Sequence, residues 1–211
     1  MRAMPFLMCV FCFFAVPFAM ASDEMKVYSL LSKGDWRSSY FLMSKFDKRG
    51  DNRFAGILGS LYESGRGVPK SDQIAEKYYR KAIKRGVSFS DYALAQMIKD
   101  GRAKESYSGE MIDLLKRSAN EGYAFSIFHL AYIYREGVLT GRDNIEAYKW
   151  FNILSGYSPV DSTAAMIESA VDMREIIAAE LSADDLVRAQ GLSVDWERAH
   201  QERLCKAGFP C

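Results

Sequence analysis

The chain repeats one pattern of apolar and glycine positions at a constant interval of 36 residues. The positions that keep this interval include Leu58, Leu94 and Leu130, Gly65, Gly101 and Gly137, and Gly50, Gly86 and Gly122. Within an interval the apolar residues lie three and four positions apart, which is typical of an amphipathic helix. A period between about 20 and 50 residues indicates small stacked units that bury their apolar faces against their neighbours.

The clearest unit runs from Phe54 to Gly86 and predicts two helices joined by a glycine-rich turn. We expect Gly59 to let the two helices approach closely. Gly65 would end the first helix, because glycine adopts the left-handed conformation at little energetic cost. The expected buried positions are Leu58, Leu61 and Tyr62 in the first helix and Ala75, Tyr78, Tyr79 and Ala82 in the second.

A truncated unit at residues 23–50 predicts a leading cap for the stack, with a first helix from Asp23 to Ser32. Asp35 would cap its second helix, which runs from Trp36 to Arg49. The positions of that helix expected to face inward are Ser39, Leu42, Met43 and Phe46.

Full units are predicted at residues 51–86, 87–122 and 123–157. Ser108 would cap the second helix of the middle unit, in which Met111, Leu114 and Leu115 face inward. Asp143 or Asn144 would cap the second helix of the last one.

A degenerate closing unit is predicted at residues 158–204. Its long helix would begin at Asp161 or Ser162, and Ser182 would cap a closing helix that leads to Trp196. The positions of the closing helix that match Ala75, Tyr78 and Tyr79 are Ala183, Leu186 and Val187.

The motif of the clearest unit resembles a known family. It reads Leu58-Gly59-x-x-Tyr62-x-x-Gly65-x-Gly67-Val68, then Ala75-x-x-Tyr78-Tyr79-x-x-Ala82 and Gly86, and it is similar to the Sel1-like repeat, a relative of the tetratricopeptide repeat. The middle unit departs from the motif at Ile98, Ala103 and Met111. The resemblance implies an all-α, right-handed superhelical solenoid of antiparallel helix pairs that acts as a protein-binding scaffold.

Residues 1–21 are typical of a secretory signal peptide. Arg2 is their only charge, an apolar run extends from Pro5 to Phe18, and Ala19-Met20-Ala21 precedes Ser22. The alternative is an uncleaved membrane anchor, but the run is short for a span of about 20 residues. We expect cleavage, no stable membrane span afterwards, and, on the bacterial setting that the resemblance implies, a periplasmic or secreted protein.

The charge balance limits the kinds of partner that the protein can bind, and the cysteine content bears on the cellular compartment in which it functions. Without Arg2 the chain has 27 basic and 27 acidic side chains, and this balance argues against a nucleic-acid partner. Cys205 and Cys211 would form a disulfide loop at residues 205–211, because export leads to an oxidising compartment. A metal site is the weaker alternative, because the spacing of these cysteines matches no common zinc motif.

Catalytic chemistry has little support in the sequence. His129 and His200 lie far apart without an evident acid or metal partner. Gly65-x-Gly67 lacks the preceding strand and the Lys-Ser/Thr pair directly after the second glycine that a phosphate-binding loop requires. We therefore predict no catalytic residues, no metal and no cofactor.

A partner would bind the inner face of the stack. On the analogy with tetratricopeptide repeats, the inward-facing positions outside the core are Phe89, Tyr92, Gln96, Lys99, Phe125, Phe128, Tyr132 and Arg135. Aromatic and Arg side chains often dominate binding energy. The alternative is that the long helix of the closing unit fills this face, in which case the aromatic side chains are ordinary core.

The sequence therefore predicts an exported scaffold that binds a partner protein or peptide. Two alternatives stay open, namely a secreted host-contact factor and a cell-wall-related hydrolase or peptidoglycan-binding protein. Relatives linked to the latter carry a disulfide in each repeat, and this chain has no cysteine inside its repeats.

Overall fold

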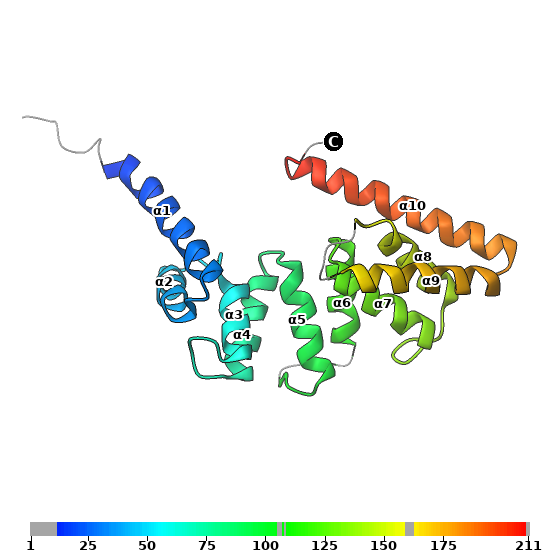
Figure 1. Cartoon of the computed structure of the whole chain (residues 1–211), viewed down its shortest axis with the longest axis horizontal. Helices are drawn as coiled ribbons and strands as arrows, with labels where there is room; N and C mark the ends of the chain where they lie inside the picture. The colour runs from blue at the N-terminus through cyan, green and yellow to red at the C-terminus, as the bar shows by residue number, and fades with distance from the viewer. Residues whose placement is uncertain (1–11, 105–106, 108, 159–162, 210–211) are drawn as a thin grey trace, which may run out of the picture. The chain divides into compact units, whose positions relative to one another are not determined.

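The computed structural model describes residues 12–104, 107, 109–158 and 163–209, with the side chains of residues 12–21 outside that description. Ten α-helices make up the regular structure of these residues, and they include no strand (Figure 1). The predicted all-α fold class is confirmed. The chain divides into two compact units, Met1–Ala82 and Ile83–Cys211, which are described separately below.

The first unit is built from four helices. They are α1 (Cys12–Ser32), α2 (Trp36–Lys48), α3 (Ala55–Ser64) and α4 (Asp72–Ile83). A core between α1, α2 and α3 consists of Val27, Leu42, Met43, Phe46, Phe54, Leu58 and Leu61, and Tyr78 of α4 packs against it. Three of the positions predicted for the leading cap therefore belong to this core. Helix α1 begins at Cys12, earlier than the predicted Asp23, and runs past the predicted cleavage point after Ala21.

Local sequence explains where these helices begin and how closely they pack. The Asp35 carboxylate accepts a hydrogen bond from the backbone N–H of Ser38 at 3.1 Å, which confirms Asp35 as the cap of α2. Gly65 ends α3 in the left-handed conformation, with φ of 72°. A Cβ atom at Gly59 would lie 2.7 Å from the Tyr79 ring, so only glycine lets α3 and α4 pack this closely.

The second unit is built from six helices. They are α5 (Ser88–Lys99), α6 (Glu110–Asn120), α7 (Ala124–Glu136), α8 (Asn144–Ser155), α9 (Ala164–Glu180) and α10 (Ala183–Lys206). From α5 to α9 each helix packs on the next, and α10 returns to pack on α8. Leu94, Leu115, Leu130 and Phe151 are buried in this unit at positions that the repeat pattern predicts. Asp143 caps α8, as expected, by accepting hydrogen bonds from the N–H groups of Ile145 and Glu146.

Three predictions concern the buried side of α6, the cap of α6 and the start of α9. The first is wrong, and the other two involve residues outside those that the structure describes. In α6 the buried residue is Ile112 and Met111 is only partly buried. The N-cap of α6 is Gly109, and the predicted cap, Ser108, lies outside the described residues. Helix α9 begins at Ala164, and the predicted starts, Asp161 and Ser162, also lie outside them.

The predicted buried face of the closing helix is also wrong. Ala183 and Val187 are exposed, Val187 to 68%. The buried positions are instead Ala189, Ser193 and Trp196. The reason is that α10 follows the long helix α9, not the short first helix of a repeat, so the 36-residue register does not extend to it. Its contact with α8 centres on Trp196, whose ring meets the Trp150 ring edge to face at 6.2 Å.

Candidate partner-binding face

The predicted inner-face residues come from α5 and α7, and their rings meet between the two helices. Tyr92 of α5 lies 5.8 Å from Phe125 and 5.5 Å from His129 of α7, measured between ring centroids. Tyr123, just before α7, contacts both Tyr92 and Phe89. We call this set the aromatic row, and its members are Phe89, Tyr92, Tyr123, Phe125, Phe128 and His129.

The aromatic row is partly open. Phe89 is 37% exposed, and Tyr92, Phe125 and Phe128 are half-buried. If α9 filled the whole inner face, these four side chains would be buried. Since they are not, α9 leaves this part of α5 and α7 accessible within the second unit.

The other end of the inner face is occupied by α9. The Tyr132 and Ser169 hydroxyls lie 3.1 Å apart, and Arg135 donates two hydrogen bonds to the Glu180 carboxylate at 2.5 and 2.6 Å. Hydrogen bonding to Arg135 lowers the pKa of Glu180 to about 2, so this contact stays ionised at neutral pH. Tyr132 and Arg135 thus hold α9 in place.

His129 lies where the aromatic row meets a cavity. Its Nε2 atom lies 3.3 Å from the Tyr92 hydroxyl. Burial, with a smaller contribution from the charge of Lys99, lowers the pKa of His129 below its ordinary value. The imidazole is therefore neutral at pH 7 and serves as a polar contact beside the rings. Among the described residues no carboxylate hydrogen-bonds to it, and they contain no cluster of three potential metal ligands.

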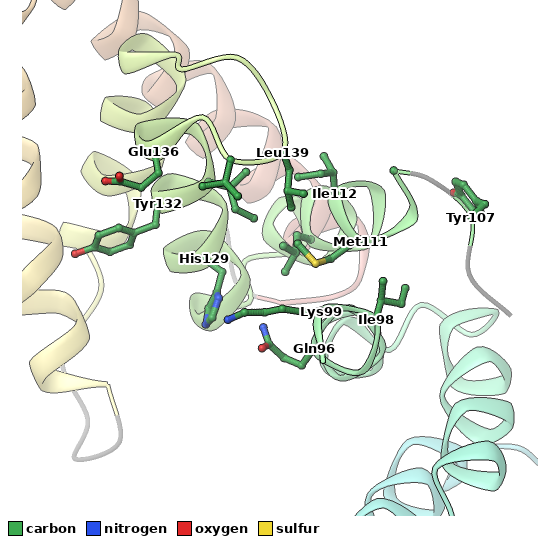
Figure 2. A pocket seen from close by; sticks show the side chains of 14 residues that line it. Gln96, Ile98, Lys99, Tyr107, Met111, Ile112, His129, Tyr132, Glu136 and Leu139 are labelled. Atoms are coloured by element: carbon green, nitrogen blue, oxygen red, sulfur yellow. The ribbon is translucent and has the colours of Figure 1, made fainter. Parts of the chain in front are cut away.

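An open cavity of about 720 Å³ adjoins the aromatic row. Figure 2 shows the side chains that line it, which come from α5, α6, α7, Tyr107 before α6 and the loop after α7. Its apolar wall includes Ile112, Leu115, Ile133, Val138 and Leu139, and its polar groups include Gln96, Lys99, His129, Tyr132 and Glu136. Gln96 and Lys99, predicted as inner-face residues, therefore line the cavity rather than the aromatic row.

Sequence reasoning missed part of this site. Tyr123 and His129 were not selected, because the tetratricopeptide analogy samples only four positions per helix. Val138 and Leu139 follow the glycine that ends α7, and their exposure of 75% and 53% depends on the path of the loop. An apolar pair in a turn that is otherwise polar was the available signal for them.

The predicted disulfide and the predicted signal peptide concern residues at the two ends of the chain. Cys205 lies near the end of α10 and Cys211 outside the described residues, so their pairing stays a prediction. The signal peptide likewise stays a prediction. No helix within the described part of the chain combines the length and apolar character needed to cross a bilayer.

Comparison with known proteins identifies two copies of a known sequence repeat and a curated relative. The Sel1 repeat model matches residues 57–87 and 124–153. The alginate biosynthesis protein AlgK of Pseudomonas syringae pv. tomato is 26% identical over 136 residues, which is 64% of this chain and 27% of AlgK. The chain therefore spans about a quarter of the length of this curated relative.

Two solved structures share the fold. The first is c5321, a protective antigen present in uropathogenic Escherichia coli strains that displays an SLR fold. It matches with a TM-score of 0.60 and 21% identity over 82% of this chain and 36% of its own. The second is a Sel1 repeat protein from Oxalobacter formigenes, with a TM-score of 0.58 and 18% identity over 84% of each chain. At 21% and 18% identity, the similarity to these two structures is a similarity of fold, that is, of how the helices are arranged.

Proposed function

We propose that this chain, which is a Sel1-like repeat protein, is an exported scaffold that binds a partner protein or peptide along the aromatic row and the adjoining cavity. Repeats of this kind are protein-interaction units. The observation that carries the proposal is that Phe89, Tyr92, Phe125 and Phe128 stay accessible although α9 packs on the same unit.

The arrangement suits capture of a partner on a rigid surface. The rings are held by helices whose opposite faces are buried, so little conformational entropy is lost when a partner packs on them. Aromatic side chains supply large contact areas and are enriched among residues that dominate binding energy. Binding of this kind needs no reaction, and the proposal includes no catalysis and no cofactor.

Cross-linking tests the binding face directly. A photoreactive phenylalanine derivative would replace Phe89 in one variant and Val187, exposed on α10, in a control variant. We expect irradiation of living cells to capture a discrete partner from position 89 and not from position 187. Substituting Tyr92→Ala in the first variant should abolish the adduct. Equal capture from both positions, or an adduct that survives the substitution, would contradict the proposal.

Export is the second part of the proposal and has its own test. Cell fractionation should place the protein in the periplasm or the medium, and amino-terminal sequencing should begin at Ser22. Cys205 should react with an alkylating reagent only after reduction if it pairs with Cys211. A cytosolic protein with an intact amino terminus would contradict export without affecting the binding face.

A part in polysaccharide biosynthesis is a second candidate, favoured by the match to the alginate biosynthesis protein AlgK over 64% of this chain. In that case the partner captured at position 89 would be a component of polysaccharide-synthesising machinery. Mass spectrometry of the adduct distinguishes this setting from a host-contact role, in which the adduct would form only when host proteins are added.

A further inference from the structure

The cavity beside the aromatic row has a group of polar side chains at one end. Gln96 and Lys99 lie three positions apart on α5, so their side chains project from the same face of the helix. His129 of α7 lies close to them, since its imidazole is 3.3 Å from the Tyr92 hydroxyl and the charge of Lys99 is near enough to act on it. Figure 2 shows the ends of the three side chains near one another. We call Gln96, Lys99 and His129 the polar end of the cavity.

The polar end is cationic. Among the residues that the structure describes, no ion pair involves Lys99, and His129 is neutral at pH 7. Glu136 also lines the cavity, but its carboxylate turns away from Leu139 in Figure 2, and its charge interacts with that of the neighbouring Arg135. Lys99 is therefore available to an anionic group of a ligand.

The rest of the lining is mostly aliphatic. Its side chains include those of Ile98, Met111, Ile112, Leu115, Ile133 and Leu139. The hydroxyls of Tyr107 and Tyr132 lie within hydrogen-bonding distance of Asp113 and Ser169, which do not line the cavity. Away from its polar end, the cavity thus offers apolar contact and few hydrogen-bonding partners.

We propose that the cavity binds a medium-chain fatty acid, with the carboxylate at Lys99 and the aliphatic chain along Ile133 and Leu139. Gln96 supplies a hydrogen-bond donor beside the cation. The volume of about 720 Å³ falls within the range of about 300–1,000 Å³ of small-molecule sites, which are mostly apolar with a few polar groups.

A peptide segment would fill this cavity less well. Its backbone amides would face aliphatic side chains, and a polar group that loses water without gaining a hydrogen bond costs free energy. An aliphatic chain has no such groups between its head and its end. A fatty acid in the cavity leaves the aromatic row free for a protein partner, so the inference goes beyond the proposed function.

The chain and the head group should contribute separately to affinity. Burial of a methylene group contributes about 0.8 kcal/mol, which is roughly a fourfold change in affinity. An exposed ion pair contributes up to about 1 kcal/mol, roughly a fivefold change. Binding should therefore strengthen with chain length and, by a few fold, with a negative head group.

Titrations of the intact protein followed by two-dimensional NMR test both contributions. The probes are octanoate, octanol, octyltrimethylammonium and decanoate, each below the concentration at which it forms micelles. We expect octanoate to bind a few fold more tightly than octanol, and octyltrimethylammonium to bind most weakly. Decanoate should bind several-fold more tightly than octanoate, and the shifts should be confined to residues of the cavity.

Variants of the protein assign the two contributions to residues. Lys99→Met keeps the aliphatic stem but removes the charge, so it should weaken octanoate a few fold and leave octanol unchanged. Lys77→Met, at an exposed lysine of α4, is the control and should change neither affinity. Leu139→Asn should weaken both probes, whereas Val187→Asn, at an exposed position of α10, should weaken neither.

The inference is overturned if none of the probes binds, if octanoate and octyltrimethylammonium bind equally, or if Lys99→Met leaves the affinity for octanoate unchanged. A peptide arm separates the other source of a carboxylate. If acetyl-Gly-Leu-Leu with a free carboxylate binds more tightly than decanoate, the cavity takes the carboxyl terminus of a protein and not a fatty acid. Phe89 is not among the lining residues, so capture of a partner at position 89 tests the proposed function independently.

Discussion

Gly59 sets the distance between α3 and α4, because a side chain there would meet the Tyr79 ring. Tyr79 is fully buried, and its hydroxyl donates a hydrogen bond to Glu63 at 2.6 Å, so the ring has little freedom to move away. At this one position the absence of a methyl group decides how two helices pack.

Gly59→Ala should therefore destabilise the protein by about 1–3 kcal/mol, the usual cost of overpacking a core. The matched control is Gly191→Ala in α10, where a Cβ atom would meet nothing within 4 Å. That change should stabilise the protein by about 0.5–1 kcal/mol, because alanine favours the helix over glycine. Urea unfolding measures the free energy of unfolding of both variants. A Gly59→Ala protein as stable as the parent would show that the Tyr79 ring can move aside without cost.

His129 should make stability depend on pH. Its pKa in the folded protein lies below the ordinary value of 6.5, so the unfolded chain binds more protons as the pH falls through 6.5. Stability is therefore full above that pH and decreases below it. We expect the urea midpoint to fall between pH 7.5 and 5.5, and to fall less in His129→Gln. His200, whose pKa is lowered by burial, should give the remaining dependence. An unchanged pH dependence in the His129→Gln protein would exclude this assignment.

Among the helices, α9 determines how much of the inner face is open. Arg135, Arg142 and Asn144 all donate hydrogen bonds to Glu180, the last residue of α9. Tyr132 holds the first half of the same helix through Ser169. These contacts explain why two of the predicted binding residues, Tyr132 and Arg135, lie against α9.

Glu180→Gln should loosen α9, because the glutamine side chain lacks the charge that binds the two arginines. The expected result is several-fold faster hydrogen exchange of the amides in the last turns of α9. Glu175→Gln, at an exposed carboxylate of the same helix, is the control and should leave the exchange rates unchanged. Exchange rates that are equal in both variants would mean that apolar packing alone holds α9.

The repeat pattern predicted the helix pairs because their apolar spacing is local. Leu58 and Gly59 in α3, and Leu130 in α7, are buried as the 36-residue period requires. The period could not predict α10, since Val187 is exposed and Trp196 is buried. It also could not show which part of the inner face α9 covers, because that depends on single contacts such as Arg135 with Glu180. The cavity depends in the same way on the path of the loop at Val138 and Leu139.

At the scale of the whole molecule, the chain divides into two compact units. Since residues 83–211 form a compact unit, a fragment of these residues should fold by itself. We expect it to show a helical far-UV spectrum and one cooperative thermal transition. A shorter fragment of residues 83–158 lacks α10 and exposes Trp150, so its transition should be broad or absent. Loss of cooperativity in the longer fragment would mean that the second unit requires the first.

Helix α10 also limits how such an array could be lengthened by design. Its Trp196 side covers α8, and its other side is mostly polar, with Gln190, Asp195 and Arg198 exposed beside two valines, Val187 and Val194. A repeat fused after Lys206 would meet this mostly polar side, where two exposed valines do not make a continuous apolar face on which to stack. New repeats would have to be inserted upstream of α8, where helix pairs still offer apolar faces to one another.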